Sequence, residues 1–140
     1  KQHGKNSQYA LCASQWHKTL TYKDDFFTDG MTYDADFTKE FGYAPPYQAA
    51  ESSAALLVFK DAFERANSFD KVKVRDALAD TNMQTFYGNI KFAEGGQNVD
   101  KPMVLFQVMC DGDNCENKVV APTKWASAEL IHPIPSWSQR

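Results

Sequence analysis

The sequence of 140 residues predicts a single domain of the α/β or α+β class, with helices in its middle and strands toward its end. One long segment without glycine or proline carries apolar residues at helical spacing. The segments after it carry apolar runs bounded by glycine, asparagine and aspartate, which is typical of strands and turns. We expect helices over about 31–41, 46–66 and 70–80, and strands over about 86–92, 103–110 and 117–121.

Composition bounds the classes of protein that fit. Hydrophobic residues make up 43% of the chain and charged residues 24%, which indicates a folded globular protein. The net charge of −3 without a basic run gives no reason to expect a nucleic-acid partner. No apolar run approaches the roughly 20 residues that span a bilayer. The chain begins "KQHGKNSQY", without methionine or an apolar signal region, so we expect a piece of a longer, mature protein.

Local signals place the ends of the helices. Gly42 suits the position after the first helix, and Pro45 and Pro46 prevent helix before them and favour one after them. Asn67 is a plausible end for the second helix, and Asp70 a plausible N-cap for the third. The expected apolar sides comprise Met31, Ala35, Phe37 and Phe41 in the first helix, Ala50, Ala54, Leu57, Val58 and Phe63 in the second, and Val74, Ala77 and Leu78 in the third.

The remaining segments are shorter. Residues 8–16 indicate a strand or extended segment, and residues 17–30 a connecting loop that Gly30 ends. The strands 103–110 and 117–121 are joined by the tip "DGDNCE", whose composition predicts a hairpin. Residues 123–130 predict a last helical turn.

The order of these motifs resembles a known family. The segments "FGYAPPYQAAESSAALLVFKDAFERA", "VRDALA", "TFYGNIKFAEGGQN" and "KPMVLFQV" follow one another as in the C-terminal portion of type I periplasmic binding proteins of ABC transporters, in the branched-chain amino acid (Leu/Ile/Val) receptor branch. The resemblance runs from about Tyr9 to Trp137. It implies a Rossmann-like, two-lobed fold of which residues 1–140 are one incomplete domain. Residues 17–100 would complete lobe 1, and residues 1–16 and 101–140 would supply lobe 2 and hinge segments.

The resemblance also implies a function. The chain would be a periplasmic or extracellular solute-binding component that takes an amino acid or related small polar ligand in an interlobe cleft, with permease subunits as partners and no cofactor. The alternative is a self-associating structural module, a homodimer formed through exposed lobe surfaces, with no ligand of its own. The hairpin tip "CDGDNCEN" departs from the family, whose turn there is shorter.

Four residues are candidates for ligand binding. Tyr47 stands at a helix start, where its ring suits a ligand side chain and the helix N-terminus favours a carboxylate. A tyrosine packed on the preceding prolines is the alternative. Gln48 and Glu51 lie on or near the same turn, and Glu51 would meet an ammonium or simply favour the helix dipole. Trp16 would wall the cleft or belong to the core.

Catalysis and metal binding have weak support. The three histidines are scattered, no serine or cysteine lies in a nucleophile motif, and cysteines and histidines lack zinc spacing, so we expect no enzyme and no metal site. We expect Cys110 and Cys115 to form a disulfide if the compartment is oxidising. A calcium-type loop is the alternative, but the tip lacks the full 12-residue pattern. Cys12 has no assigned role.

Overall fold

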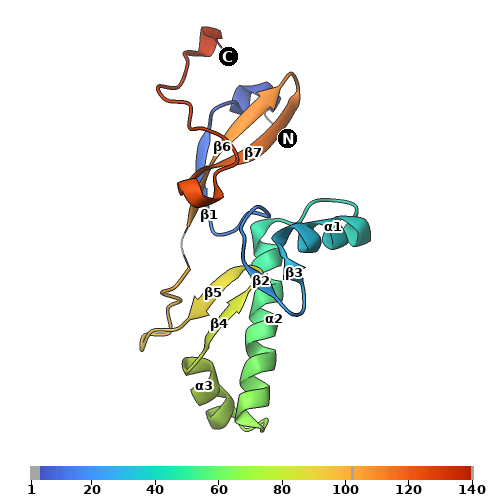
Figure 1. The fold of residues 1–140 in the computed structure, drawn as a ribbon, viewed down its shortest axis with the longest axis vertical. Helices are drawn as coiled ribbons and strands as arrows, with labels where there is room; N and C mark the ends of the chain where they lie inside the picture. The colour runs from blue at the N-terminus through green and yellow to red at the C-terminus, as the bar shows by residue number, and fades with distance from the viewer. Residues whose placement is uncertain (1–3, 102, 140) are drawn as a thin grey trace.

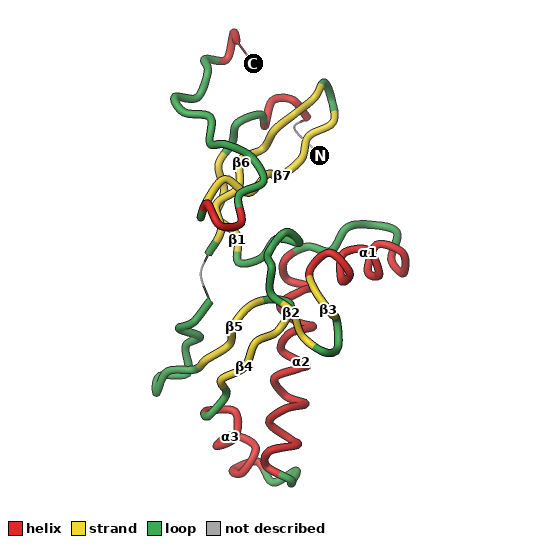
Figure 2. Tube along the Cα trace, in the orientation of Figure 1, coloured by secondary structure: helices red, strands yellow, loops and turns green. Residues whose placement is uncertain are grey.

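The computed structural model describes residues 4–101 and 103–139, which form two bodies (Figures 1 and 2). The upper body contains residues 4–14 and 104–139, and the lower body contains residues 23–98. Residues 15–22, the first connector, and the described residues 99–101 and 103, the second connector, lie between them. The upper body holds an antiparallel sheet of order β1–β6–β7, formed by β1 (Leu11–Ser14), β6 (Val104–Asp111) and β7 (Asn114–Ala121), with short 3₁₀ turns at Gly4–Ser7, Thr123–Trp125 and Trp137–Gln139.

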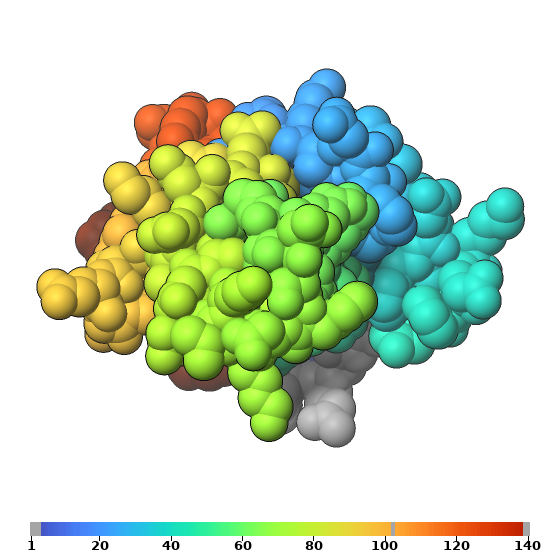
Figure 3. All heavy atoms as spheres, turned by 90° about the horizontal axis from the view of Figure 1, so that it is seen from below, coloured from blue at the N-terminus to red at the C-terminus, as the bar shows by residue number. Residues whose placement is uncertain are grey.

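The lower body is built on one long helix. It comprises α1 (Gly30–Phe41), α2 (Tyr47–Ala66) and α3 (Lys71–Ala79), with the antiparallel pairs β2 (Lys23–Asp24) with β3 (Thr28–Asp29) and β4 (Asn82–Thr85) with β5 (Gly88–Lys91). Seen from below, the ends of α2 and α3 fill the middle of this body, and α1 lies at one side (Figure 3).

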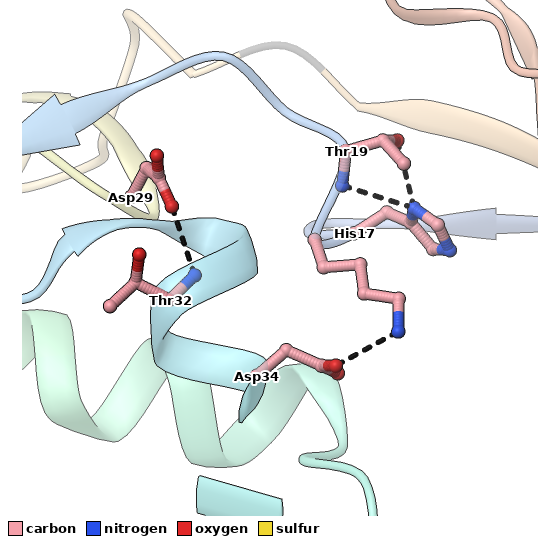
Figure 4. Close-up of polar contacts among 6 residues, drawn as sticks. His17, Thr19, Asp29, Thr32 and Asp34 are labelled. Atoms are coloured by element: carbon pink, nitrogen blue, oxygen red, sulfur yellow. Dashed lines mark hydrogen bonds and ion pairs between the residues drawn. The ribbon is translucent and has the colours of Figure 1, made fainter. Parts of the chain in front are cut away.

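The helices begin and end at the residues that local chemistry favours. At the start of α1, Asp29 Oδ1 accepts a hydrogen bond of 2.9 Å from the Thr32 amide (Figure 4). At its end, Gly42 has a left-handed φ of 76° and donates its amide to the Thr38 carbonyl at 2.8 Å. These contacts confirm the predicted bounds of the first helix to within one residue.

The next two helices also confirm the prediction. The α2 helix starts directly after Pro46, one residue later than expected, and ends at Asn67, which takes a φ of 43°. Asp70 caps α3 by accepting from the amides of Val72 and Lys73.

One cluster of buried apolar residues runs through the lower body and reaches the upper sheet. Trp16 packs edge-on against Tyr33 and Phe86, and the rings of Tyr33 and Phe86 stack 4.4 Å apart. The cluster contains Trp16, Leu20, Tyr33, Ala50, Ala54, Leu57, Val58, Phe86, Tyr87, Ile90, Val104, Val119 and Trp125.

The predicted apolar sides of α1 and α2 are partly wrong. Met31 and Phe41 are more than half exposed, and Tyr33 is the buried aromatic of α1. The Tyr33 hydroxyl lies 3.0 Å from Ser53 Oγ, so α1 presents Tyr33 to α2. In α2, Phe63 is 36% exposed and Ala62, four residues after Val58, is buried instead.

The predicted strand 86–92 is confirmed only over β5, and its partner strand β4 was not predicted. Phe86 and Tyr87 form the two-residue turn of a hairpin, with Thr85 opposite Gly88. The turn is fixed by a distant residue, because Asp24 Oδ2 accepts a 2.6 Å hydrogen bond from the Phe86 amide. Gly88 has a φ of 145°, which side-chain-bearing residues rarely adopt.

The expected connecting loop 17–30 contains a small hairpin. The β2–β3 pair is two residues long on each side, too short for an alternating pattern in the sequence. Asp24 Oδ1 accepts from the amides of Phe26 and Phe27 and so shapes its turn. The expectation of an unpaired loop is therefore corrected.

The predicted hairpin of the upper body is confirmed, but β6 is shifted by one residue from the expected range and β7 begins three residues earlier than expected. The β6–β7 pairing continues through Cys110 and Cys115 to Asp111 opposite Asn114, so only Gly112 and Asp113 form the turn. The structure joins Cys110 to Cys115 by a disulfide. The expected long tip is wrong because the extra residues extend the strands. The last predicted helical turn is confined to Thr123–Trp125.

The cap of α3 gives a test of the lower body. Replacing Asp70 with alanine leaves the amides of Val72 and Lys73 without their acceptor, so we expect the free energy of unfolding to fall by about 1 kcal/mol. Urea unfolding followed by circular dichroism measures the change. The variant Asp70→Asn keeps an acceptor and is expected to lose much less. An equal loss in both variants would contradict this account of the cap.

Candidate functional site

A cleft of about 340 Å³ lies between the two bodies at the start of α2. Its walls come from three parts of the chain that are distant in sequence. The upper body contributes Ser14, Phe106 and Asn117, the first connector Trp16, His17 and Lys18, and the lower body Asp34, Ala44, Pro45, Pro46, Tyr47 and Gln48. Larger hollows of about 420 and 520 Å³ occur, but each is lined by the lower body alone. The cleft at the start of α2 is lined by both bodies, and we therefore consider it as the candidate site.

The start of α2 presents unsatisfied backbone donors to this cleft. Pro46, the N-cap residue, makes no capping hydrogen bond with its side chain. Among the described residues, the amides of Tyr47 and Gln48 have no hydrogen-bond acceptor. A helix of 20 residues places the positive end of its dipole here. This end of the cleft therefore favours a negatively charged or carbonyl oxygen.

Aromatic side chains supply much of the apolar wall. Tyr47 is 38% exposed and lines the cleft beside Pro45 and Pro46. Trp16 is only 5% exposed, so it is a core residue that also lines the cleft, and its role in ligand binding stays a prediction. Phe106 adds a ring from β6. The wall suits an apolar group on a small ligand.

The charged side chains of the cleft are already engaged. Lys18 Nζ lies 2.8 Å from Asp34 Oδ2 and ties the first connector to α1 (Figure 4). His17 Nδ1 lies 2.9 Å from Thr19 Oγ1 and accepts from the Thr19 amide at 3.4 Å (Figure 4). Burial, and next the charge of Lys18, lower the pKa of His17 below its usual value. His17 is therefore a neutral side chain at neutral pH.

The structure brings three of the four predicted site residues together. Trp16, Tyr47 and Gln48 line the cleft, but Glu51 does not. Glu51 lies one turn along α2 and lines a separate groove of about 320 Å³. The charge of Glu51 also helps to raise the pKa of Tyr87, which lines the same groove. A role for Glu51 at a ligand's ammonium stays a prediction.

Other lining residues were missed by the sequence analysis. His17 and Lys18 directly follow Trp16, so the prediction that Trp16 lines the cleft could have been extended to both of them. Asp34, Phe106 and Asn117 carry no such signal, because their place at the cleft depends on how the two bodies meet.

A second polar group lies behind the cleft, around Tyr87. Lys101 Nζ donates to the Tyr87 carbonyl at 2.6 Å and lies 3.7 Å from the centre of the Tyr87 ring. Burial lowers the pKa of Lys101 to about 8, and the charge of Glu51 partly offsets this. Burial also raises the pKa of Tyr87, followed by the charge of Glu51.

The described part of the chain has neither a cluster of metal ligands nor a membrane-spanning helix. No group of three or more His, Cys, Asp or Glu side chains in residues 4–101 and 103–139 is placed to hold a metal ion. Over the same residues, no helix is long and apolar enough to cross a membrane.

Comparison with known proteins gives the fold. No protein-family model matches the sequence. A leucine-binding protein LivK from Thermotoga maritima shares 20% identity at a TM-score of 0.62, over 86% of this chain and 33% of its own. A periplasmic binding protein from Burkholderia mallei shares 16% identity at a TM-score of 0.68, over 90% of this chain and 35% of its own. A protein from Silicibacter pomeroyi, described as a branched-chain amino acid ABC transporter, shares 18% identity at a TM-score of 0.66, over 91% and 35%.

This chain has part of the periplasmic-binding-protein fold. The fold expected from the sequence is thus confirmed. The chain spans about a third of the length of each solved protein that it matches. At identities of 16 to 20%, the likeness establishes the fold, while the ligand has to be argued from the cleft.

The pKa of His17 gives a test of its surroundings. Because its pKa in the folded chain lies below 6.5, the unfolded chain takes up the proton first as the pH falls. The contribution of His17 is therefore present above pH 6.5 and is lost as the pH falls through the lower folded pKa. We expect His17→Gln to lose less free energy of unfolding than the unchanged protein between about pH 7 and pH 5, measured by urea unfolding. The exposed His132, changed to glutamine, serves as the control, and an equal effect there would contradict the prediction.

Proposed function

We propose that the chain is the C-terminal part of a periplasmic or extracellular solute-binding protein of an ABC transporter. It would hold an amino acid, or a related small carboxylate or amide, in the cleft between its two bodies. The observation that carries the proposal is the position of this cleft, which lies between the bodies at the uncapped start of α2, with Tyr47 and Trp16 in its walls. The proposal is also supported by the fold, because the chain that forms this cleft has part of the periplasmic-binding-protein fold.

The chemistry of the walls suits such a ligand. The free amides of Tyr47 and Gln48 would donate hydrogen bonds to a carboxylate or carbonyl oxygen of the ligand at the positive end of α2. The rings of Tyr47 and Phe106 would pack on an apolar side chain of the ligand. The mechanism is non-covalent capture, followed by closure of the two bodies about their connectors.

We assign the two bodies to the two lobes that the resemblance implies, as part of this proposal. In this proposal, residues 17–100 complete lobe 1, and residues 1–16 and 101–140 supply lobe 2 and the hinge. The rest of each lobe would come from the remaining two-thirds of the fold, which this chain does not span. The membrane partner would be the permease of the transporter.

A nuclear magnetic resonance titration tests the cleft directly. We expect leucine, isoleucine and valine, added to about 10 mM, to shift the amide signals of Tyr47 and Gln48 and the indole signal of Trp16, with weak affinity because much of the fold is absent. The variant Tyr47→Ala should reduce these shifts, and Tyr43→Ala should retain them, since Tyr43 is an exposed tyrosine outside the cleft lining. Unchanged spectra with every amino acid tested would contradict ligand binding by this chain.

Self-association is the second candidate, and one observation favours it. Leu56, Phe59 and Phe63 lie on one side of α2 and are 71%, 45% and 36% exposed. An apolar side of this kind is normally covered by other parts of a fold or by a partner. In the first proposal the missing part of the fold covers it, whereas in the second a second copy does.

Sedimentation velocity separates the two candidates. Self-association through α2 predicts a dimer at about 100 μM that Leu56→Lys converts to a monomer, because a charge would be buried in the interface. Glu94→Lys, at an exposed position away from α2, should leave the dimer intact. A monomer in the unchanged protein would exclude this candidate and would leave the titration of the cleft unaffected.

A further inference from the structure

Both connectors between the two bodies are attached to one residue of the lower body, Tyr87. This residue lies in the turn between β4 and β5 and is only 4% exposed. Gln15 in the first connector and Lys101 in the second are separated by 86 positions in the sequence, the difference of 101 and 15, yet each makes a polar contact with Tyr87.

The contacts use three different parts of Tyr87. Its hydroxyl donates to Gln15 Oε1 at 3.0 Å. Its carbonyl accepts from Lys101 Nζ at 2.6 Å, and the face of its ring lies 3.7 Å from the same nitrogen. A charged donor to a carbonyl, combined with a cation over an aromatic ring, is a strong pair of interactions in a partly buried place.

The neighbouring residue is shaped to admit Lys101. A Cβ atom on Gly88 would lie 3.1 Å from Lys101 Nζ and 3.4 Å from two of its side-chain carbons. The φ of Gly88 is also one that other residues rarely adopt. The turn is thus built so that the lysine side chain lies flat against it.

The two connectors differ in how else they are held. The first connector is also bound at its other end, where Trp125 Nε1 of the upper body donates to Thr21 Oγ1 at 3.2 Å and the Trp125 ring lies 5.4 Å from that of Tyr22. Within the described part of the second connector, Lys101 makes the side-chain contact that reaches the hairpin turn. The second connector is also held to β5, because the Val99 amide donates to the Lys91 carbonyl at 2.9 Å and Asn89 Nδ2 donates to Asp100 Oδ2 at 3.3 Å. Among its described residues, Lys101 makes the attachment nearest to β6, and this attachment is to Tyr87.

We propose that Tyr87 is a hinge anchor, which ties both connectors to the lower body through Gln15 and Lys101 and so sets the angle between the two bodies. The anchor does not depend on a ligand. Its consequence, that it sets how the two walls of the cleft face each other, rests on the proposed function.

Double electron–electron resonance tests the anchor without any ligand, because it measures the distribution of distances between two spin labels. One label goes on the exposed Cys12 of β1 in the upper body, and the other on Val72→Cys at an exposed position of α3 in the lower body. We expect Tyr87→Phe, which removes only the bond to Gln15, to broaden the distance distribution. Lys101→Met removes the bond to the carbonyl and the contact with the ring, so it should broaden the distribution more and shift its mean.

The controls make the outcome decisive. Lys39→Met removes an exposed lysine of α1 and should leave the distribution unchanged. Circular dichroism checks that each variant is folded, and Gln15→Leu replaces Lys101→Met if the latter does not fold. Folded Tyr87 and Lys101 variants that keep the distribution of the unchanged protein would overturn the anchor. Because no ligand is added, a failure of amino acid binding would not affect this result.

Discussion

The packing of Trp16 against Tyr33 and Phe86 is the interaction on which the rest of the structure depends. These three rings come from the first connector, from α1 and from the turn between β4 and β5, so one contact joins three separate segments. Phe86 is completely buried, and a large cavity would follow its loss. Since Trp16 also lines the cleft, the same packing that closes the core fixes the back wall of the candidate site.

The cluster has a second consequence, because the turn that presents Phe86 to the core also presents Tyr87 to the connectors. Asp24 holds this turn by accepting the Phe86 amide, and Gly88 gives it a backbone shape that admits Lys101. The core and the hinge anchor are therefore neighbours in one two-residue turn. A change that loosens this turn is expected to affect both the stability of the lower body and the angle between the bodies.

Sequence reasoning succeeded where the signals are local. The end of α1 follows from Gly42 and the start of α3 from Asp70, and the effect of each residue reaches no further than one helical turn. It was only partly right at 86–92, where an alternation of apolar residues predicted one strand and the structure has a turn followed by β5. The turn there depends on Asp24, 62 residues earlier, and no local pattern carries that information. For the same reason Tyr47 was predicted at the cleft from its place before a helix, while Phe106 and Asn117 on the upper body were not.

The electrostatics of the cleft limit what this part of the fold contributes to binding. Lys18 is paired with Asp34, and His17 is held neutral by burial and by the charge beside it. A ligand in the cleft therefore meets ring faces and the free amides at the start of α2, and no unpaired charged side chain among the described lining residues. An ionic group on the ligand has to be matched by the helix dipole or by the part of the fold beyond this chain. For a zwitterionic amino acid, this makes binding by the isolated chain weak and directed toward the carboxylate.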